Sequence, residues 1–277
     1  MFTRNLKPQF ITNLLNEPLW QDKLKLKYDC QKGDVFLAIR NNRVDFYYKG
    51  GKIFSYDGKR FLTHVKYARI PLASTKDYIM ETDLSLVQSH VSFLDIYKII
   101  KDNCAHYSEN ERDGVSNIIQ NYSYTKNNDI VVLDTEIGLD RGNVDILLFN
   151  TENSTLQFIE AKRFNNKELW ANVKNKNVVD QINKYEDSIL KHKINIIEQY
   201  VNHINYLNSI FGLALPVPEA LLEKVVLLVF DFDQDQLDGS LTKKLKNSPK
   251  FQGYKFYGFG NSKKLEIDKL WKAKPLP

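Results

Sequence analysis

Three ionisable residues lie in two short apolar segments of this chain. Asp145 belongs to residues 142–149, and Glu160 and Lys162 end residues 156–162. Burial of an unpaired charge is costly, so such groups usually pair with one another or bind a metal ion. Strand alternation places Glu160 and Lys162 on one face, and Asp145 can face them if the two segments form a hairpin. Two carboxylates and a lysine would then suit a hard divalent cation and an activated water.

Two helix-like segments flank these strands and carry further polar candidates. In the upstream segment, Glu111 precedes Val115, Ile118 and Ile119 at spacings that put it on the inward face, so it is preferred over Glu109. In the downstream segment, Gln181 and Tyr185 are four residues apart, which places both polar tips on one side of a helix.

The ordered set of Glu111, Asp145, Glu160-Ala161-Lys162 and the Gln181-x-x-x-Tyr185 pair resembles the PD-(D/E)xK nuclease superfamily, in its RecB-like branch. The resemblance covers the second half of the chain and lacks the Pro-Asp that names the motif. It implies an α/β fold with a restriction-endonuclease-like mixed sheet flanked by helices. It also implies hydrolysis of phosphodiester bonds with Mg²⁺ (or Mn²⁺) as the cofactor.

The chemistry of phosphodiester hydrolysis gives these residues roles. A divalent cation offsets the repulsion between an anionic substrate and an attacking hydroxide, and it neutralises the leaving oxygen. We expect Asp145 and Glu160 to be metal ligands, with the Ala161 carbonyl as a third donor. Lys162 would orient the water or stabilise developing charge, and Glu111 would bind a second metal or position its water.

Gln181 and Tyr185 are assigned to substrate contact or to bracing the site, and a structural role fits them equally well. For the whole set, the competing interpretation is a buried ion-pair network that stabilises an α/β core.

The first third of the sequence has a different pattern. Short strand candidates alternate with the turn signals Asn41-Asn42, Gly50-Gly51 and Asp57-Gly58, which predicts an antiparallel meander. The candidates are residues 34–39, 43–48, 52–56 and 60–65. Helical spacing over 84–100 predicts a connector. We therefore expect a β-rich N-terminal domain over 1–100 and a nuclease domain over 101–277.

Cationic and aromatic residues alternate along this meander. Lys49, Lys52, Lys59 and Arg60 could neutralise phosphates while neighbouring tyrosines stack on bases, which would form a nucleic-acid clamp. The alternative is a sheet with an aromatic core face and a basic outer face.

Later segments complete the α/β pattern. Residues 177–212 read as a long helix with an apolar stripe, and 224–232 and 253–259 read as strands. The stripe comprises Ile194, Ile197, Tyr200, Val201, Ile204, Leu207 and Phe211. The acidic run 231–239 lacks the glycine and glutamate of a calcium loop, so we interpret it as the start of a helix.

Composition narrows the class of protein. The formal net charge of +5 slightly favours anionic partners, and the two cysteines indicate neither a disulfide framework nor a zinc site. No apolar run is long enough to span a membrane, and the N-terminus lacks a secretory pattern, so we expect a cytoplasmic protein without membrane association.

These observations favour a metal-dependent nuclease that hydrolyses DNA, as an effector in restriction or antiphage defence. RNA remains open as a substrate, and a homodimer or a partner defence protein remains open as an assembly. The alternative function is a non-catalytic nucleic-acid-binding or assembly subunit that retains the nuclease fold.

Overall fold

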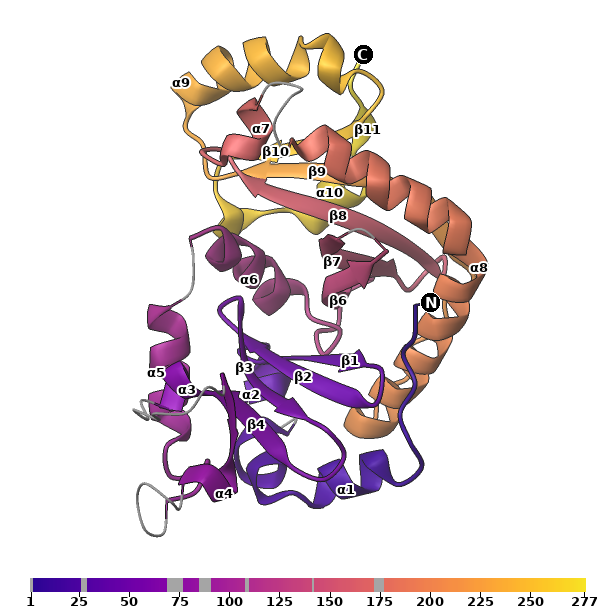
Figure 1. Ribbon diagram of the computed structural model, residues 1–277. Coiled ribbons are helices and arrows are strands. Elements are labelled where there is room, and N and C mark those ends of the chain that lie inside the picture. Colours follow the sequence, from indigo (N-terminus) through magenta and orange to yellow (C-terminus); the bar gives the residue numbers. More distant parts are fainter. Residues whose placement is uncertain are drawn as a thin grey trace. The chain divides into compact units, whose positions relative to one another are not determined.

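The chain divides into two compact units in the computed structural model, each built around its own β-sheet (Figure 1). The structure describes residues 2–25, 29–68, 77–84, 91–107, 110–140, 142–171 and 177–277. The N-terminal unit comprises residues 3–126 and 201–215, and the C-terminal unit comprises residue 2, 127–200 and 216–277. The fold is therefore mixed α/β, as expected. The boundary near residue 100 stays a prediction.

The N-terminal unit contains a five-stranded antiparallel sheet in the order β1-β2-β3-β4-β5, which confirms the predicted meander. Its strands are β1 (Phe36–Arg40), β2 (Arg43–Tyr48), β3 (Gly51–Tyr56), β4 (Phe61–His64) and β5 (Tyr78–Met80). Asn42 adopts a φ of 50°, and Lys49 and Gly50 adopt 46° and 74°. Positive φ values at both central residues are typical of the tight turns that match strand twist.

Helices and an aromatic core complete this unit. The helical segments are α1 (Phe10–Asn16), η1 (Trp20–Leu24), α2 (Asp29–Lys32), α3 (Val65–Ala68), α4 (Glu81–Leu84), α5 (Tyr97–His106) and α6 (Asn110–Tyr122). Phe46, Phe54 and Tyr56 are fully buried, and the Phe61 ring lies 4.8 to 5.9 Å from theirs. This apolar cluster fixes one face of the sheet and leaves polar side chains for the other.

The C-terminal unit contains a six-stranded mixed sheet in the order β11-β10-β9-β8-β7-β6. The strands are β6 (Ile130–Leu139), β7 (Gly142–Asn150), β8 (Thr155–Arg163), β9 (Ala220–Phe230), β10 (Lys255–Phe259) and β11 (Lys274–Pro275). β6, β7 and β8 are antiparallel neighbours, whereas β9 runs parallel to both β8 and β10. The long connection from β8 to β9 carries the crossover helix that a parallel pair requires.

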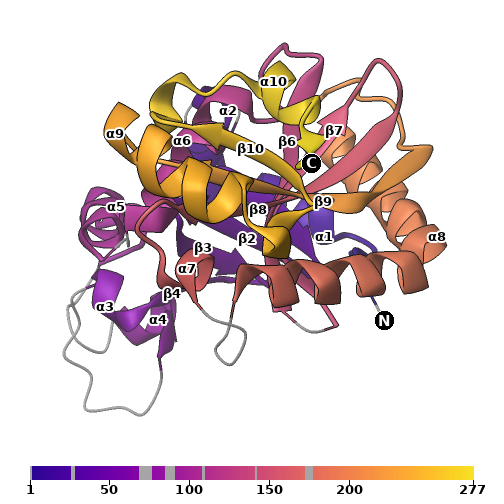
Figure 2. The same cartoon turned by 90° about the horizontal axis from the view of Figure 1, so that it is seen from above.

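Helices cover both sides of this sheet. α7 (Lys167–Trp170) and the first part of α8 (Val178–Phe211) lie on one side, and α10 (Ile267–Trp271) lies on the other (Figure 2). Between β9 and β10 come α9 (Gln234–Gln236), η2 (Leu237–Lys246) and η3 (Pro249–Phe251), and η4 (Ser262–Lys264) follows β10. Asp233 and Gln236 form a capping box at the start of α9, which confirms the helix start predicted for the acidic run.

Two helical expectations need correction. The described residues 91–96 are not helical, and α5 begins only at Tyr97, so a continuous helix over 84–100 is wrong. α8 has non-helical dihedral angles at His192 (φ −117°, ψ 15°). The change in direction there interrupts the helical period, and Ile194, expected in the buried stripe, is 75% exposed.

Candidate active site in the C-terminal sheet

The β7–β8 hairpin brings Asp145 and Glu160 to neighbouring positions. The register pairs Ile146 with Ile159, so the next step along both strands sets Asp145 opposite Glu160. The Ala161 backbone N–H donates a hydrogen bond of 2.7 Å to Asp145 Oδ2. The hairpin expected from the sequence is therefore present, and it places both carboxylates on one face of the sheet.

Glu160 is a buried carboxylate with only part of its hydrogen-bonding capacity used. Glu160 is 2% exposed. Its Oε1 lies 2.9 Å from Lys162 Nζ, and its Oε2 is buried without a hydrogen-bond partner. Burial raises the pKa of Glu160 well above its usual value, and the nearby charge of Asp145 raises it further, whereas Lys162 opposes the shift. A bound cation would therefore favour the ionised form of Glu160.

Lys162 lies between two glutamates. Its Nζ is 3.0 Å from Glu168 Oε2 as well as 2.9 Å from Glu160 Oε1. Glu168 is in the short helix α7, where the Asn166 side chain accepts a hydrogen bond from the Glu168 N–H at 2.8 Å. Gln181 Nε2 donates to the same Glu168 oxygen at 3.0 Å. Glu168 thus links two of the residues predicted from the sequence.

Sequence reasoning missed Glu168 because its local pattern gives only an indirect signal. It follows β8 after a turn, and its direction depends on the geometry of residues 164–166. The capping residue Asn166 was the one signal available, since it predicts a helix start that would orient Glu168.

Tyr185 contacts the beginning of β7. Its hydroxyl donates a 2.7 Å hydrogen bond to the Asn143 carbonyl. A Cβ added at Gly142 would lie only 3.1 Å from the Tyr185 hydroxyl oxygen. Burial is the main cause that raises the pKa of Tyr185, with Glu160 and Asp145 adding to the effect. Tyr185 therefore stays neutral near pH 7 and holds the strand that carries Asp145.

The backbone of β6 is strained opposite Asp145. Glu136 has a φ of 51°, and it lies between the ladder pairs Thr135–Ile146 and Ile137–Val144. A positive φ at a non-glycine residue inside a strand is uncommon and concentrates at functional sites. The sequence gives no sign of this conformation, and Glu136 was not among the predicted site residues.

Oxygen donors at this site fit Mg²⁺ or Mn²⁺, although the described side chains do not form a complete cage. Among the residues that the structure describes, no three His, Cys, Asp or Glu side chains are grouped closely enough to hold a metal ion. Mg²⁺ keeps several waters and often binds through one or two carboxylates plus substrate phosphates. Asp145 and the unpartnered oxygen of Glu160 supply that number of carboxylates. The Ala161 carbonyl remains a predicted third donor.

Glu111 is the predicted site residue whose side chain the structure does not describe. The helix expected around it is confirmed, because α6 spans Asn110–Tyr122 with Ile118 and Ile119 buried. Its side chain lies outside the described residues, and α6 belongs to the N-terminal unit.

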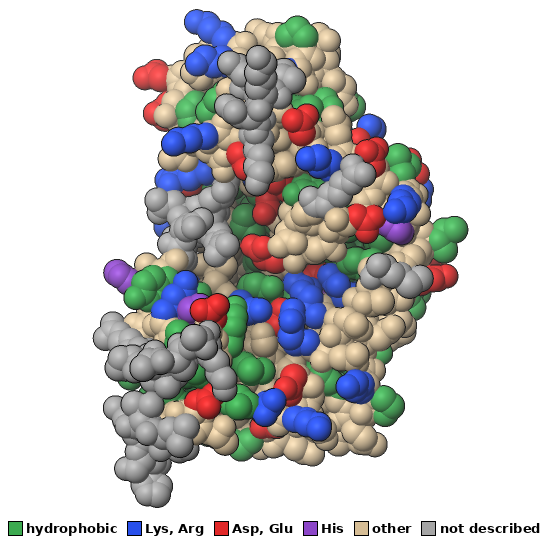
Figure 3. All heavy atoms as spheres, in the orientation of Figure 1, with side chains coloured by type: hydrophobic (Ala, Val, Ile, Leu, Met, Phe, Trp, Pro, Cys, Tyr) green, Lys and Arg blue, Asp and Glu red, His purple; other side chains and the backbone are tan. Residues whose placement is uncertain are grey.

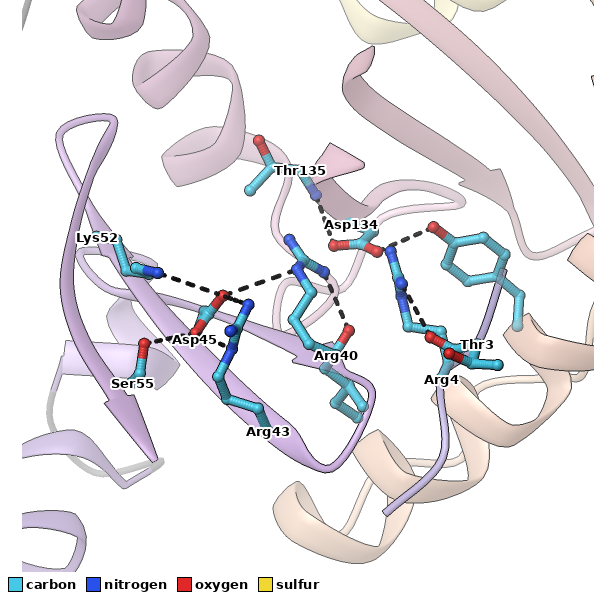
Figure 4. Close-up of polar contacts among 11 residues, drawn as sticks. Thr3, Arg4, Arg40, Arg43, Asp45, Lys52, Ser55, Asp134 and Thr135 are labelled. Carbon is cyan, nitrogen blue, oxygen red and sulfur yellow. Dashed lines mark hydrogen bonds and ion pairs between the residues drawn. The ribbon is translucent and has the colours of Figure 1, made fainter. Parts of the chain in front are cut away.

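Lys52 belongs to a cationic cluster around the buried Asp45 in the N-terminal sheet (Figure 4). Lys and Arg side chains also gather on the face of the molecule drawn in Figure 3. Arg43 forms two contacts with the Asp45 carboxylate, at 2.9 and 3.0 Å, and Ser55 Oγ donates to it at 2.7 Å. Lys52 Nζ is 4.0 Å from this carboxylate, and Arg40 Nε is 3.9 Å from it. Three cationic side chains thus surround one carboxylate.

Burial lowers the pKa of Lys52, although Asp45 opposes the shift. The Lys52 ammonium also lies 5.1 Å from the centre of the Tyr78 ring. Cation–π and ion-pair contacts fix this side chain, and Arg43, with 46% of its side chain exposed, gives the cluster access to solvent. Three cations around one carboxylate give the cluster a net positive charge.

The other three predicted cations lie in turns of the same sheet. Lys49 is half-buried at the β2–β3 turn, with Nζ 6.0 Å from the Tyr48 ring centre. Lys59 and Arg60 are exposed after β3, where Asp57 accepts hydrogen bonds from both of their backbone N–H groups. Arg60 Nε is 3.3 Å from Asp57, so part of its charge is already matched.

Comparison with known proteins gives no relative. No protein-family model, no curated protein and no solved structure matches this chain. Among the described residues, no helix is long and apolar enough to cross a membrane.

Proposed function

We propose that the protein is a PD-(D/E)xK nuclease that hydrolyses DNA phosphodiester bonds with Mg²⁺ or Mn²⁺. The C-terminal unit would be its restriction-endonuclease-like domain. The observation that carries the proposal is Glu160, a buried carboxylate beside Asp145 with one unpartnered oxygen and a lysine on the other. A buried carboxylate left half satisfied needs an explanation, and a cation ligated during function supplies one.

The residues of the site support specific roles. Asp145 and Glu160 would hold the metal, which when bound lowers the pKa of water and neutralises charge on the phosphate. Lys162, held between Glu160 and Glu168, would orient the attacking water or stabilise the developing negative charge. In the reaction, the water oxygen forms a bond to phosphorus, the bond to the leaving sugar oxygen breaks, and that oxygen takes a proton.

Two residues of α8 would position the reacting groups. Gln181 fixes Glu168, and through it Lys162, whereas Tyr185 fixes the first residues of β7. Such fixed partners matter because small displacements of reacting groups reduce rates strongly.

The proposed chemistry extends to a proposed biological role. A DNA-cleaving effector in restriction or antiphage defence, acting in the cytoplasm alone, as a homodimer or with a partner protein, fits this set of residues. RNA is the alternative substrate. Incubation of the protein with supercoiled DNA, linear DNA, single-stranded DNA and RNA, with and without Mg²⁺, tests both the activity and the substrate.

A non-catalytic nucleic-acid-binding or assembly subunit is the second candidate. It is favoured by the ion pairs that Lys162 makes with Glu160 and Glu168, since these alone could account for buried charges in a stable core. Absence of Mg²⁺-dependent cleavage on every substrate, together with intact nucleic-acid binding, would select this candidate.

A further inference from the structure

A basic hollow lies in the C-terminal unit on the side of α7. Its volume is about 510 Å³. Its lining includes Trp170, Lys243, Lys244, Lys250 and Phe251. None of the described residues that line it is acidic. Phe251 is buried, so the aromatic surface that the hollow offers is that of Trp170. Lysines beside one accessible aromatic ring, without carboxylates, fit an anionic ligand that also has flat apolar surfaces.

The lysines of this hollow are held in different ways. Lys243 and Lys244 are exposed in the last turn of η2, and in the part of the chain that the structure describes neither forms an ion pair. Lys250 is half-buried, donates a 2.9 Å hydrogen bond to the Ala171 carbonyl and lies 5.2 Å from the Phe251 ring centre. Cations in a last helical turn also suit the helix dipole, so their charge alone does not identify a ligand.

Trp170 adds an oriented aromatic ring to the hollow. Its indole N–H donates a 2.8 Å hydrogen bond to the Phe164 carbonyl, and the Phe164 ring meets it edge-on at 5.2 Å. The indole is therefore held in a fixed orientation while remaining partly exposed. An oriented aromatic ring beside lysines is typical of surfaces on which single-stranded nucleic acids stack their bases.

The hollow and the candidate active site share the helix α7. Glu168 and Trp170 are two residues apart in this helix, and Glu168 Oε2 lies 3.0 Å from Lys162 Nζ. We propose that the hollow lined by Trp170, Lys243, Lys244 and Lys250 binds a single strand of nucleic acid beside the site. The lysines contact phosphates and a base stacks on Trp170. This inference rests on the proposed function, which it extends by naming a single-stranded segment as the bound form.

Binding measured without catalysis tests this inference separately from cleavage. Fluorescence anisotropy of a labelled DNA single strand in EDTA would be followed for the wild type, Lys243→Gln/Lys244→Gln and Trp170→Leu. Lys263→Gln/Lys264→Gln is the matched control, because it neutralises an exposed lysine pair of the same unit outside the hollow. Circular dichroism would establish that each variant is folded.

The expected result is a weaker affinity for the double variant and a salt slope reduced by about 1.4, from about 0.7 for each lost phosphate contact on a single strand. Trp170→Leu should lose roughly tenfold in affinity. The control pair should keep the wild-type affinity and salt slope.

Equal affinities for the wild type and the Lys243/Lys244 variant would overturn the inference. So would a labelled polyglutamate peptide that binds the hollow while the DNA strand does not, since the partner would then be an acidic protein. If substitution of Asp145 abolishes cleavage while the Lys243/Lys244 variant binds the strand like the wild type, strand binding in the hollow is refuted. The nuclease proposal would still stand.

Discussion

Glu160 and Lys162 form a buried ion pair within β8, with 2.9 Å between Oε1 and Nζ. The two side chains are 2% and 10% exposed, so water contributes little to their solvation. The pair leaves the second Glu160 oxygen without a partner. An ion pair in a stable core would gain from satisfying that oxygen, whereas a metal ligand requires it to be available.

Stability should fall as pH rises in the absence of metal, because the pKa of Glu160 is raised in the folded protein. Between the ordinary glutamate pKa and the folded value, the native state binds more protons than the unfolded state. The free energy of unfolding therefore decreases with pH across that window. Urea unfolding in EDTA at pH 5 and pH 8 measures the difference.

Glu160→Gln should reduce that pH dependence, since the substituted amide does not titrate. Glu198→Gln, at an exposed position of α8, is the control and should keep the wild-type dependence. An unaltered dependence in Glu160→Gln would contradict the protonation assigned to this residue.

Lys162→Ala should lose most of the cleavage activity while it still binds divalent ions, because an ammonium donates hydrogen bonds and cannot ligate a cation. Removal of the lysine also leaves Glu160 and Glu168 without their shared cation, so Mn²⁺ binding should persist or strengthen. Isothermal titration calorimetry with Mn²⁺ measures this binding. If a folded Lys162→Ala variant no longer binds Mn²⁺, the role of Lys162 is instead to hold the carboxylates in position.

Neutralisation of Lys49, Lys52 and Lys59 to Gln should weaken nucleic-acid binding and flatten its salt dependence. Each lost phosphate contact should reduce the slope of log affinity against log salt by about 0.7 to 0.9. Cleavage at saturating substrate should be retained.

Lys52 differs from the other two lysines because Asp45 and Tyr78 hold it in place. A side chain that is already held in place loses less conformational entropy when it binds a phosphate. Lys52→Gln alone should therefore account for a measurable part of the loss. If the triple variant keeps the wild-type affinity and salt slope, these three lysines do not contact nucleic acid and only form a solvated face of the sheet.

The sequence predicted those features that depend on strand period and turn chemistry. Alternation in 142–149 and 156–162 was sufficient to place Asp145, Glu160 and Lys162 together, and the turn residues predicted the meander. Helical spacing also predicted that Gln181 and Tyr185 share one side of α8, and both donate hydrogen bonds to residues around the site.

Features that depend on tertiary geometry could not be predicted in this way. Glu168 reaches Lys162 only because of the turn after β8, and the positive φ of Glu136 has no signature in residue type. The kink at His192 shifts the period of α8, which is why Ile194 is exposed although its spacing favours burial.

Mg²⁺-dependent cleavage by Asp145→Asn tests the central claim most directly. Asparagine retains an oxygen that can accept the Ala161 N–H, so the fold should persist while the carboxylate is lost. Asp187→Asn, at an exposed position of α8, serves as the control. We predict cleavage by the wild type and by Asp187→Asn, and a loss of roughly 100-fold or more in Asp145→Asn, since even outer partners of metal ligands contribute 10- to 100-fold. Wild-type turnover in folded Asp145→Asn would contradict the account.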